Sequence, residues 1–164
     1  ATSGGVYYDI MPSLTWLSND LRKARFRGVK DIILNFHQYH DKFESSATDY
    51  TRRQFQAIML TYKPLAVFAG HNHAFFRTTH ANDPFYGNTT VYRTGAAFDA
   101  KYHLVTYDNG KLTVREMDGK SGQPVLNKTY IEEPKSMSAI CKLPGKTGKA
   151  GEVYMTSFIP VGQY

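Results

Sequence analysis

Apolar and polar positions follow a helical period near the start of the chain. Leu14, Leu17, Leu21 and Ala24 recur at the spacing of one helix face, and basic residues fill the opposite face. Gly28 follows as a C-cap. The pattern therefore predicts a helix that ends at Gly28.

A second apolar face with the same spacing lies further along the chain. Phe55, Ile58, Met59 and Tyr62 stand at i, i+3, i+4 and i+7, and Pro64 stops the helix that they predict. Short apolar runs at 31–36 and 65–69 come after these helices and are typical of buried parallel strands. The order helix, strand, helix, strand indicates a layered α/β sheet with right-handed crossovers.

The pattern changes after Gly70. Residues 89–94 predict a strand, and the runs 103–107 and 111–116 flank Asn109-Gly110, which is a strong hairpin signal. The body of the domain is therefore predicted at 1–117 and ends in antiparallel strands. Residues 118–164 are rich in Gly, Lys and Pro, with short apolar pieces at 125–130 and 153–161. We interpret them as a C-terminal extension that wraps the domain or contacts a partner.

Four of the six histidines follow the two predicted parallel strands. His37 and His40 come after the first strand, and His71 and His73 come after the second. In open α/β sheets, ligands gather where the carboxyl ends of strands meet the loops, so both clusters are expected at one edge. Imidazole is the commonest metal ligand in proteins, and Gly70 allows the sharp backbone turn that a His-x-His pair needs. The sequence therefore predicts a metal site at this edge.

The motif Gly70-His71-Asn72-His73 resembles the Gly-His-x-His block of calcineurin-like metallophosphoesterases, and residues 32–37 resemble the block before it, a hydrophobic strand that delivers one His. Phe75-Phe76-Arg77 is similar to the purple acid phosphatases, where an aromatic residue and Arg follow the second His. The resemblance covers about residues 6–117. It implies an α/β fold, namely the C-terminal half of a metallophosphoesterase β-sandwich flanked by helices.

Carried over by position, the resemblance implies that His37 and His71 bind one metal ion and that His73 binds the other. The intact enzyme would hold two divalent or trivalent ions, with Zn, Mn or Fe all compatible with such ligands. Such ions act as Lewis acids and lower the pKa of a bound water. His40 and Arg77 are the candidate catalytic residues, through contact with the substrate phosphate.

Imidazole ligands need an acceptor that fixes their tautomer. Asn35, Asp41 and Asn72 are the nearest polar residues along the chain, and the sequence does not choose among them.

Three further blocks of that family are absent from the chain: Asp-x-His, Gly-Asp-x-x-Asp and Gly-Asn-His-Asp/Glu. They supply the carboxylates that allow two cations to lie close together despite their repulsion. This chain alone is therefore expected to hold at most one metal ion and to be inactive. The N-terminal half of the same protein, or a partner subunit, is expected to supply the carboxylates.

Two classes of function are compatible with these observations. The first is metal-dependent hydrolysis of a phosphate ester, as a phosphatase or phosphodiesterase whose substrate the sequence does not reveal. The second is a non-catalytic binding or structural subunit that retains the phosphoesterase frame. A nucleotide-binding P-loop is excluded at Gly145-Lys146-Thr147, because Ile140 stands where its first Gly is required.

Composition adds little to this choice. The net charge is +6, but no run of four Lys or Arg occurs, so no nucleic-acid partner is expected. The single cysteine, Cys141, cannot form an internal disulfide. Two sequons, at Asn88 and Asn127, suit a secreted or extracellular protein. No apolar run is long enough to predict a transmembrane segment.

Overall fold

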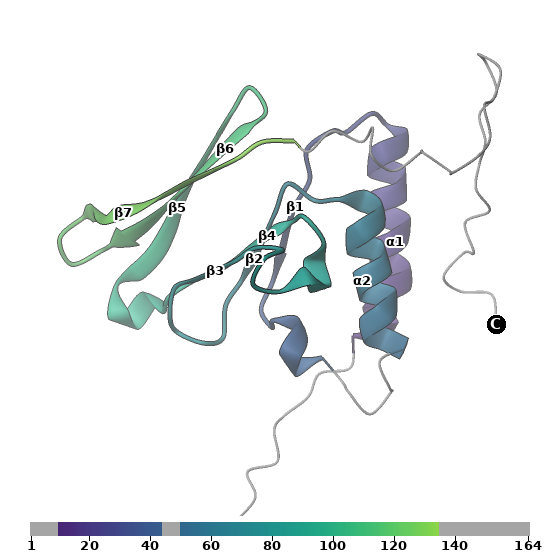
Figure 1. The fold of residues 1–164 in the computed structure, drawn as a ribbon, viewed down its shortest axis with the longest axis horizontal. Coiled ribbons are helices and arrows are strands. Elements are labelled where there is room, and N and C mark those ends of the chain that lie inside the picture. Colours follow the sequence, from purple (N-terminus) through teal and green to yellow (C-terminus); the bar gives the residue numbers. More distant parts are fainter. Residues whose placement is uncertain (1–9, 44–49, 135–164) are drawn as a thin grey trace, which may run out of the picture.

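The computed structural model describes residues 10–43 and 50–134. The chain forms a mixed α/β fold in three layers: two helices, a four-stranded sheet and a three-stranded sheet (Figure 1). The helices are α1 (Met11–Phe26) and α2 (Tyr50–Tyr62). The strands are β1 (Ile33–Phe36), β2 (Ala66–Ala69), β3 (Phe76–Thr78), β4 (Thr90–Arg93), β5 (Lys101–Asp108), β6 (Lys111–Asp118) and β7 (Gln123–Glu132). Cys141 and the apolar piece 153–161 lie outside the described residues.

Helix α1 begins and ends as its sequence predicts. Pro12 stands in the first turn, where its missing N–H costs no hydrogen bond. At the other end Gly28 has φ +82° and Val29 N–H donates to the Ala24 carbonyl at 3.1 Å. This is the Schellman arrangement, which requires a left-handed residue and so favours glycine.

The main core lies between the two helices and one face of the four-stranded sheet. The predicted faces are confirmed, because Leu14 and Leu21 of α1 and Phe55 and Met59 of α2 are all buried there. On the sheet side, alternate strand residues such as Val67 complete the cluster. Each layer therefore buries the face that its periodicity marks as apolar.

The four-stranded sheet has the order β1-β2-β4-β3. Strands β1, β2 and β4 are parallel, with Phe36 opposite Ala69 and Ala69 opposite Arg93, while the short β3 is antiparallel to β4. The sequence did not predict β3, because three residues give too short a pattern. The parallel register brings the carboxyl ends of three strands to one level.

The three-stranded sheet packs on the other face and contains the predicted hairpin. Asn109 and Gly110 both have positive φ, +47° and +82°, as a tight turn between β5 and β6 requires. Leu112 and Val114 of β6 are buried against Tyr92 of β4. The body was expected to end near residue 117, but β7 pairs with β6 and carries the sheet to Glu132. Sequence analysis assigned the apolar piece at 125–130 to the extension, whereas it lies within this strand.

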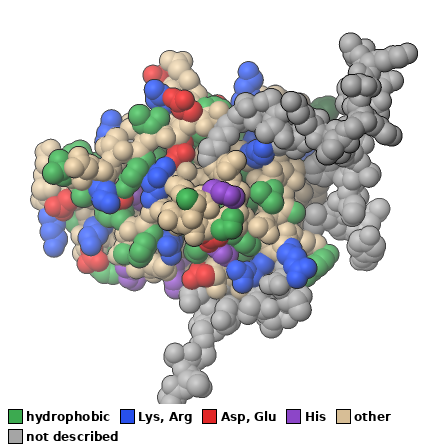
Figure 2. All heavy atoms as spheres, viewed as in Figure 1, with side chains coloured by type: hydrophobic (Ala, Val, Ile, Leu, Met, Phe, Trp, Pro, Cys, Tyr) green, Lys and Arg blue, Asp and Glu red, His purple; other side chains and the backbone are tan. Residues whose placement is uncertain are grey.

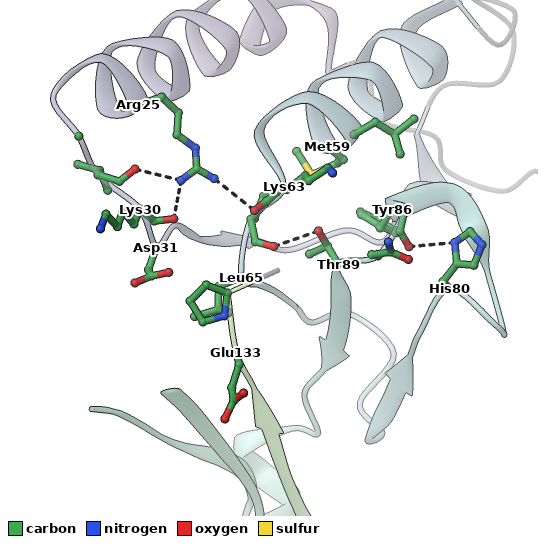
Figure 3. Close-up of a pocket in the computed structure, with 17 residues that line it drawn as sticks. Arg25, Lys30, Asp31, Met59, Lys63, Leu65, His80, Tyr86, Thr89 and Glu133 are labelled. Atoms are coloured by element: carbon green, nitrogen blue, oxygen red, sulfur yellow. Dashed lines mark hydrogen bonds between the residues drawn. The ribbon is translucent and has the colours of Figure 1, made fainter. Parts of the chain in front are cut away.

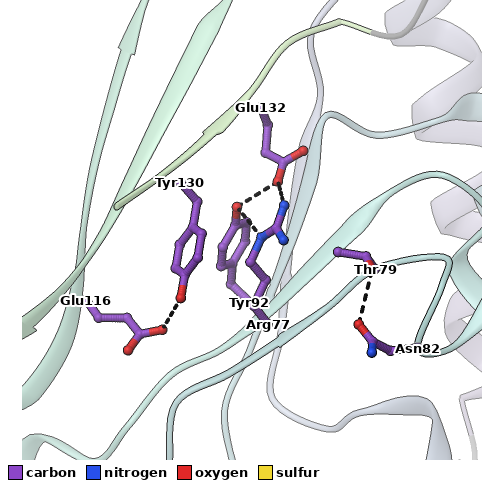
Figure 4. A network of polar contacts seen from close by, with 7 residues as sticks. All are labelled: Arg77, Thr79, Asn82, Tyr92, Glu116, Tyr130 and Glu132. Carbon is purple, nitrogen blue, oxygen red and sulfur yellow. Dashed lines mark hydrogen bonds and ion pairs between the residues drawn. The ribbon is translucent and has the colours of Figure 1, made fainter. Parts of the chain in front are cut away.

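A buried carboxylate links the two sheets (Figure 4). Glu132 Oε1, on β7, accepts a hydrogen bond from Tyr92 OH at 2.7 Å and pairs with Arg77 Nη2 at 3.2 Å. Tyr130 stacks its ring under the Arg77 guanidinium at 4.9 Å and donates its hydroxyl to Glu116. The group joins β3, β4, β6 and β7 in one network.

In the described part of the chain, no helix combines the length and the apolar character that crossing a membrane requires. On the face shown in Figure 2, basic and acidic side chains are interspersed with apolar ones, and no single basic patch gathers there.

We predict that Glu132→Ala lowers the free energy of unfolding by about 1–3 kcal/mol, because Tyr92 and Arg77 lose their shared acceptor. Glu133→Ala is the matched control, since Glu133 is exposed and its one ion pair among the described residues is with Lys111, so its cost should stay within about 0.5 kcal/mol. Urea denaturation of the full chain measures both. Equal losses in the two variants would contradict a structural role for the buried carboxylate.

Candidate metal centre

The candidate site begins where β1 and β2 end. His37 directly follows β1, and Gly70-His71 directly follows β2. Gly70 N–H donates to the His37 carbonyl at 3.0 Å, which ties the two loops together. A Cβ on Gly70 would lie 3.2 Å from His37 Nδ1, tighter than nearly all such contacts. Glycine at this position therefore lets the His37 ring lie against the backbone of the second loop.

The rings of His37 and His71 lie side by side. Their centroids are 5.3 Å apart and their planes cross at 87°. Both residues are exposed, so an ion in solution can reach them. His71 has φ +73°, a left-handed conformation that is uncommon for a residue with a Cβ. Such strain is characteristic of functional sites, because the surrounding structure must hold it in place.

His73 does not join this pair in the described contacts. Its backbone is also left-handed, with φ +55°, but its ring lies 5.0 Å from Phe98, edge on. Within residues 10–43 and 50–134, no three His, Cys, Asp or Glu side chains form a group that could hold a metal ion. The structure brings together two of the three predicted ligands, and the role of His73 stays a prediction. The pair fits part of the coordination shell of one ion, because imidazole suits Zn and Fe, two of the three candidate metals.

Gln38 is a residue of the candidate site that sequence analysis missed. Its side-chain amide lies 2.8 Å from His71 Nδ1, and the residue is buried. The amide atom nearest the ring is Nε2, and Oε1 has no hydrogen-bond partner among the described residues. A flip of the amide exchanges the two atoms and brings Oε1 to the ring. With Oε1 toward the ring, His71 Nδ1–H donates to it and Nε2 keeps its lone pair for a metal ion. Gln38 is thus a positioning residue for His71.

The three acceptors suggested by sequence proximity do not take this position. In the described structure, no side-chain hydrogen bond joins Asn35, Asp41 or Asn72 to a histidine ring. The one feature of the sequence that could have pointed to Gln38 is its position directly after His37. Sequence alone could not show that its side chain turns toward the other loop.

His40 lies in the core rather than at the exposed edge. Its ring stacks on Phe85 at 3.9 Å, and its Nε2 lies 3.3 Å from Asp83 Oδ2, which also accepts from Tyr39 OH. Burial lowers the pKa of His40 to about 4, although Asp83 opposes this shift. The contacts give His40 a structural role, and the predicted contact with substrate stays a prediction.

Arg77 points into the network between the sheets. Burial would lower its pKa, but the hydrogen bonds to Tyr92 and Glu132 outweigh it, and the net pKa is raised. Its guanidinium is bound to Glu132 and covered by Tyr130. The structure does not bring Arg77 together with the histidine pair in any described contact, so its catalytic role stays a prediction as well.

A cavity of about 610 Å³ lies at the other end of the parallel strands (Figure 3). Asp31, Leu65 and Thr89, which line it, stand just before the amino ends of β1, β2 and β4. The Arg25 side chain donates to backbone carbonyls at the ends of both helices, including those of Lys30 and Tyr62. This cavity is therefore separate from the histidine pair. The Arg25 guanidinium, which lines the cavity, already donates to backbone carbonyls.

Comparison with known proteins yields no match, either to a family model or to a curated protein. The nature of the site therefore rests on its own residues.

We predict that the chain loses stability as the pH falls from 6.5 towards 4. Burial holds the pKa of His40 and of His103 at about 4, against 6.5 for the ordinary side chain. The unfolded chain therefore binds more protons in this interval, and protonation favours unfolding. The urea midpoint should be lower at pH 5 than at pH 7, and both His40→Gln and His103→Gln should reduce that difference. His80→Gln, at an exposed histidine, is the control; an unchanged pH dependence in both test variants would refute the assignment.

Proposed function

We propose that this chain supplies the histidine ligands of a metal-dependent phosphoester hydrolase, and that a second part of the protein or a partner supplies the carboxylates. The observation that carries the proposal is the convergence of the His37 and His71 rings at the exposed end of two parallel strands. The motif resemblance of residues 32–37 and 70–73 to metallophosphoesterases supports the reaction class.

The geometry of the loops suits a ligand role better than a role in packing. A histidine that serves only packing is typically buried and fully hydrogen-bonded. His37 and His71 are exposed instead, and His71 is held in a left-handed conformation by a glycine turn and by Gln38. A metal ion at such a position supplies Lewis acidity toward phosphate oxygens and lowers the pKa of a bound water.

In this proposal the chain's own residues orient the two imidazole rings and hold their loops in place. The pair His37–His71 fixes two coordination positions, and Gln38, with Oε1 turned to the ring, fixes the tautomer of His71. The backbone bond from Gly70 to His37 keeps the two loops at a constant separation. Such preorganisation keeps the ligand geometry from relaxing while charge develops on the substrate in the transition state.

The fold leaves two strand edges that suit the missing part. Strand β1 is at one edge of its sheet and β5 is at one edge of the other, and most residues of β5 are exposed. Tyr107 OH, on β5, donates to Asp31 Oδ2 just before β1 at 2.6 Å, which links the two edges. Edges that pair with no further strand among the described residues, with exposed apolar side chains such as Leu104, are templates for added strands. Added strands of this kind are our candidates for the carrier of the carboxylates.

The alternative is a non-catalytic binding or structural subunit that retains the phosphoesterase frame. It is favoured by one observation: within the described residues only two candidate ligands lie together.

We predict that Zn²⁺ added to the full chain shifts the imidazole NMR signals of His37 and His71 together. The two rings are the only predicted ligands that the described contacts bring side by side. His71→Ala should weaken zinc binding by about tenfold or more, because one of two imidazole ligands is lost. His80→Ala, which removes an exposed histidine on another loop, should leave the affinity unchanged. Zinc that binds without perturbing His37 and His71 would contradict the shared site.

We also predict that the chain joined to its carboxylate-bearing part hydrolyses a chromogenic phosphate monoester or diester in the presence of Zn, Mn or Fe. His37→Ala and His71→Ala should each lower kcat by about a hundredfold or more, whereas the chain alone should be inactive. Metal content and circular dichroism control for loading and folding. A well-folded, metal-loaded assembly without turnover would favour the non-catalytic alternative.

A further inference from the structure

Arg93 ends β4, at the same edge of the sheet as the histidine pair. The register sets Arg93 opposite Ala69, the residue before Gly70 and His71. Ala69 in turn lies opposite Phe36, the residue before His37. Three neighbouring parallel strands therefore end level with one another. Two of them continue into the loops that carry His37 and His71, and the third ends at Arg93.

The Arg93 guanidinium lies over two aromatic rings. Its Cζ lies 4.3 Å from the centroid of Phe76, its cross-strand neighbour on β3, and 4.5 Å from the centroid of Tyr39. Tyr39 belongs to the loop that begins with His37 and follows Gln38, which contacts His71. Contact with two rings restricts the orientation of the guanidinium, while its N–H groups still point outward in the guanidinium plane.

No described residue accepts a hydrogen bond from the Arg93 guanidinium. Arg93 makes no side-chain hydrogen bond and no ion pair in the described chain, and its buried Nε has no hydrogen-bond partner. Arg77, on the neighbouring strand, is bound to Glu132. Asp83 is the carboxylate beside Tyr39, but it is occupied by the Tyr39 hydroxyl and His40.

A half-buried guanidinium without a partner among the described residues is unusual, because burial of charge is costly unless an opposite charge or acceptor lies nearby. We propose that Arg93 is an anion-binding residue and that its ligand is a phosphate group. The in-plane N–H groups of arginine match two oxygens of a phosphate in a bidentate contact. The role of Arg93 as a contact for the substrate rests on the proposed function. The binding of phosphate by Arg93 does not depend on that function.

The phosphate class follows from the neighbourhood. A carboxylate also fits the fork of a guanidinium, but the adjoining edge carries two exposed imidazoles, whose ring N–H groups can donate to the further oxygens of a phosphate. The assignment makes Arg93, rather than Arg77, the arginine that meets the phosphate.

The test uses the full chain, freed of metal with a chelator, and inorganic phosphate as the probe. In an NMR titration, phosphate should shift the Nε–H signal of Arg93 and the backbone amides around Tyr39 and Arg93. Acetate at the same ionic strength should shift them much less. A wild-type Arg93 signal that stays in place, or that responds equally to acetate, would overturn the proposal without the need for any variant.

Variants give the magnitude. Arg93→Gln should weaken phosphate binding by about tenfold or more, because charge and both donors are lost. Arg93→Lys should lie between the wild type and Arg93→Gln, because it keeps the charge without the fork. Arg22→Gln, at an exposed arginine that contacts only Asn19 in the described chain, should bind as the wild type does. Full phosphate affinity in both Arg93 variants would overturn the proposal.

Activity separates this proposal from the proposed function. In the assembled, metal-loaded protein, Arg93→Gln should raise KM by about tenfold with unchanged metal content, since the variant removes a contact with phosphate and no metal ligand. If the wild type binds phosphate through Arg93 but hydrolyses no ester, the proposed function fails and the anion site stands. If esters are hydrolysed and Arg93→Gln leaves both KM and kcat unchanged, the role of Arg93 is refuted and the proposed function stands.

Discussion

The parallel register of β1, β2 and β4 is the constraint on which the rest of the structure depends. It sets Phe36, Ala69 and Arg93 level with one another, so that whatever follows each strand emerges at one edge. Residues far apart along the chain can meet there without any long connecting loop. The imidazoles of His37 and His71 meet because the sheet, and not the local sequence, fixes their separation.

The layers on either side of this sheet keep that edge in place. The helices bury Val67 and Val91 on one face, and the three-stranded sheet buries Ala66 and Tyr92 on the other. The buried carboxylate of Glu132 adds a polar link between the sheets. Packing on both faces limits how far the strand ends can shift, which suits a site whose ligands must keep a fixed geometry.

Much of the fold could be predicted from sequence because its signals are local. Helical spacing located both helices, and Asn109-Gly110 located the hairpin. Strand order allowed the two histidine clusters to be placed at one edge, but only two of the three predicted ligands lie together. The contact of Gln38 with His71, and those of Arg93 with its two aromatic rings, join segments that are distant in sequence. No periodicity of the sequence indicates such tertiary contacts. For the same reason the sequence could not show that Arg77 is bound to Glu132.

The central claim is that His37 and His71 share one metal ion. Anomalous diffraction at the zinc edge, from crystals of the full chain grown with Zn²⁺, tests it most directly. We expect a single anomalous peak between the two rings, at about 2.0–2.1 Å from one nitrogen of each imidazole. A zinc ion bound elsewhere, or two rings that turn away from each other with no peak between them, would contradict the account.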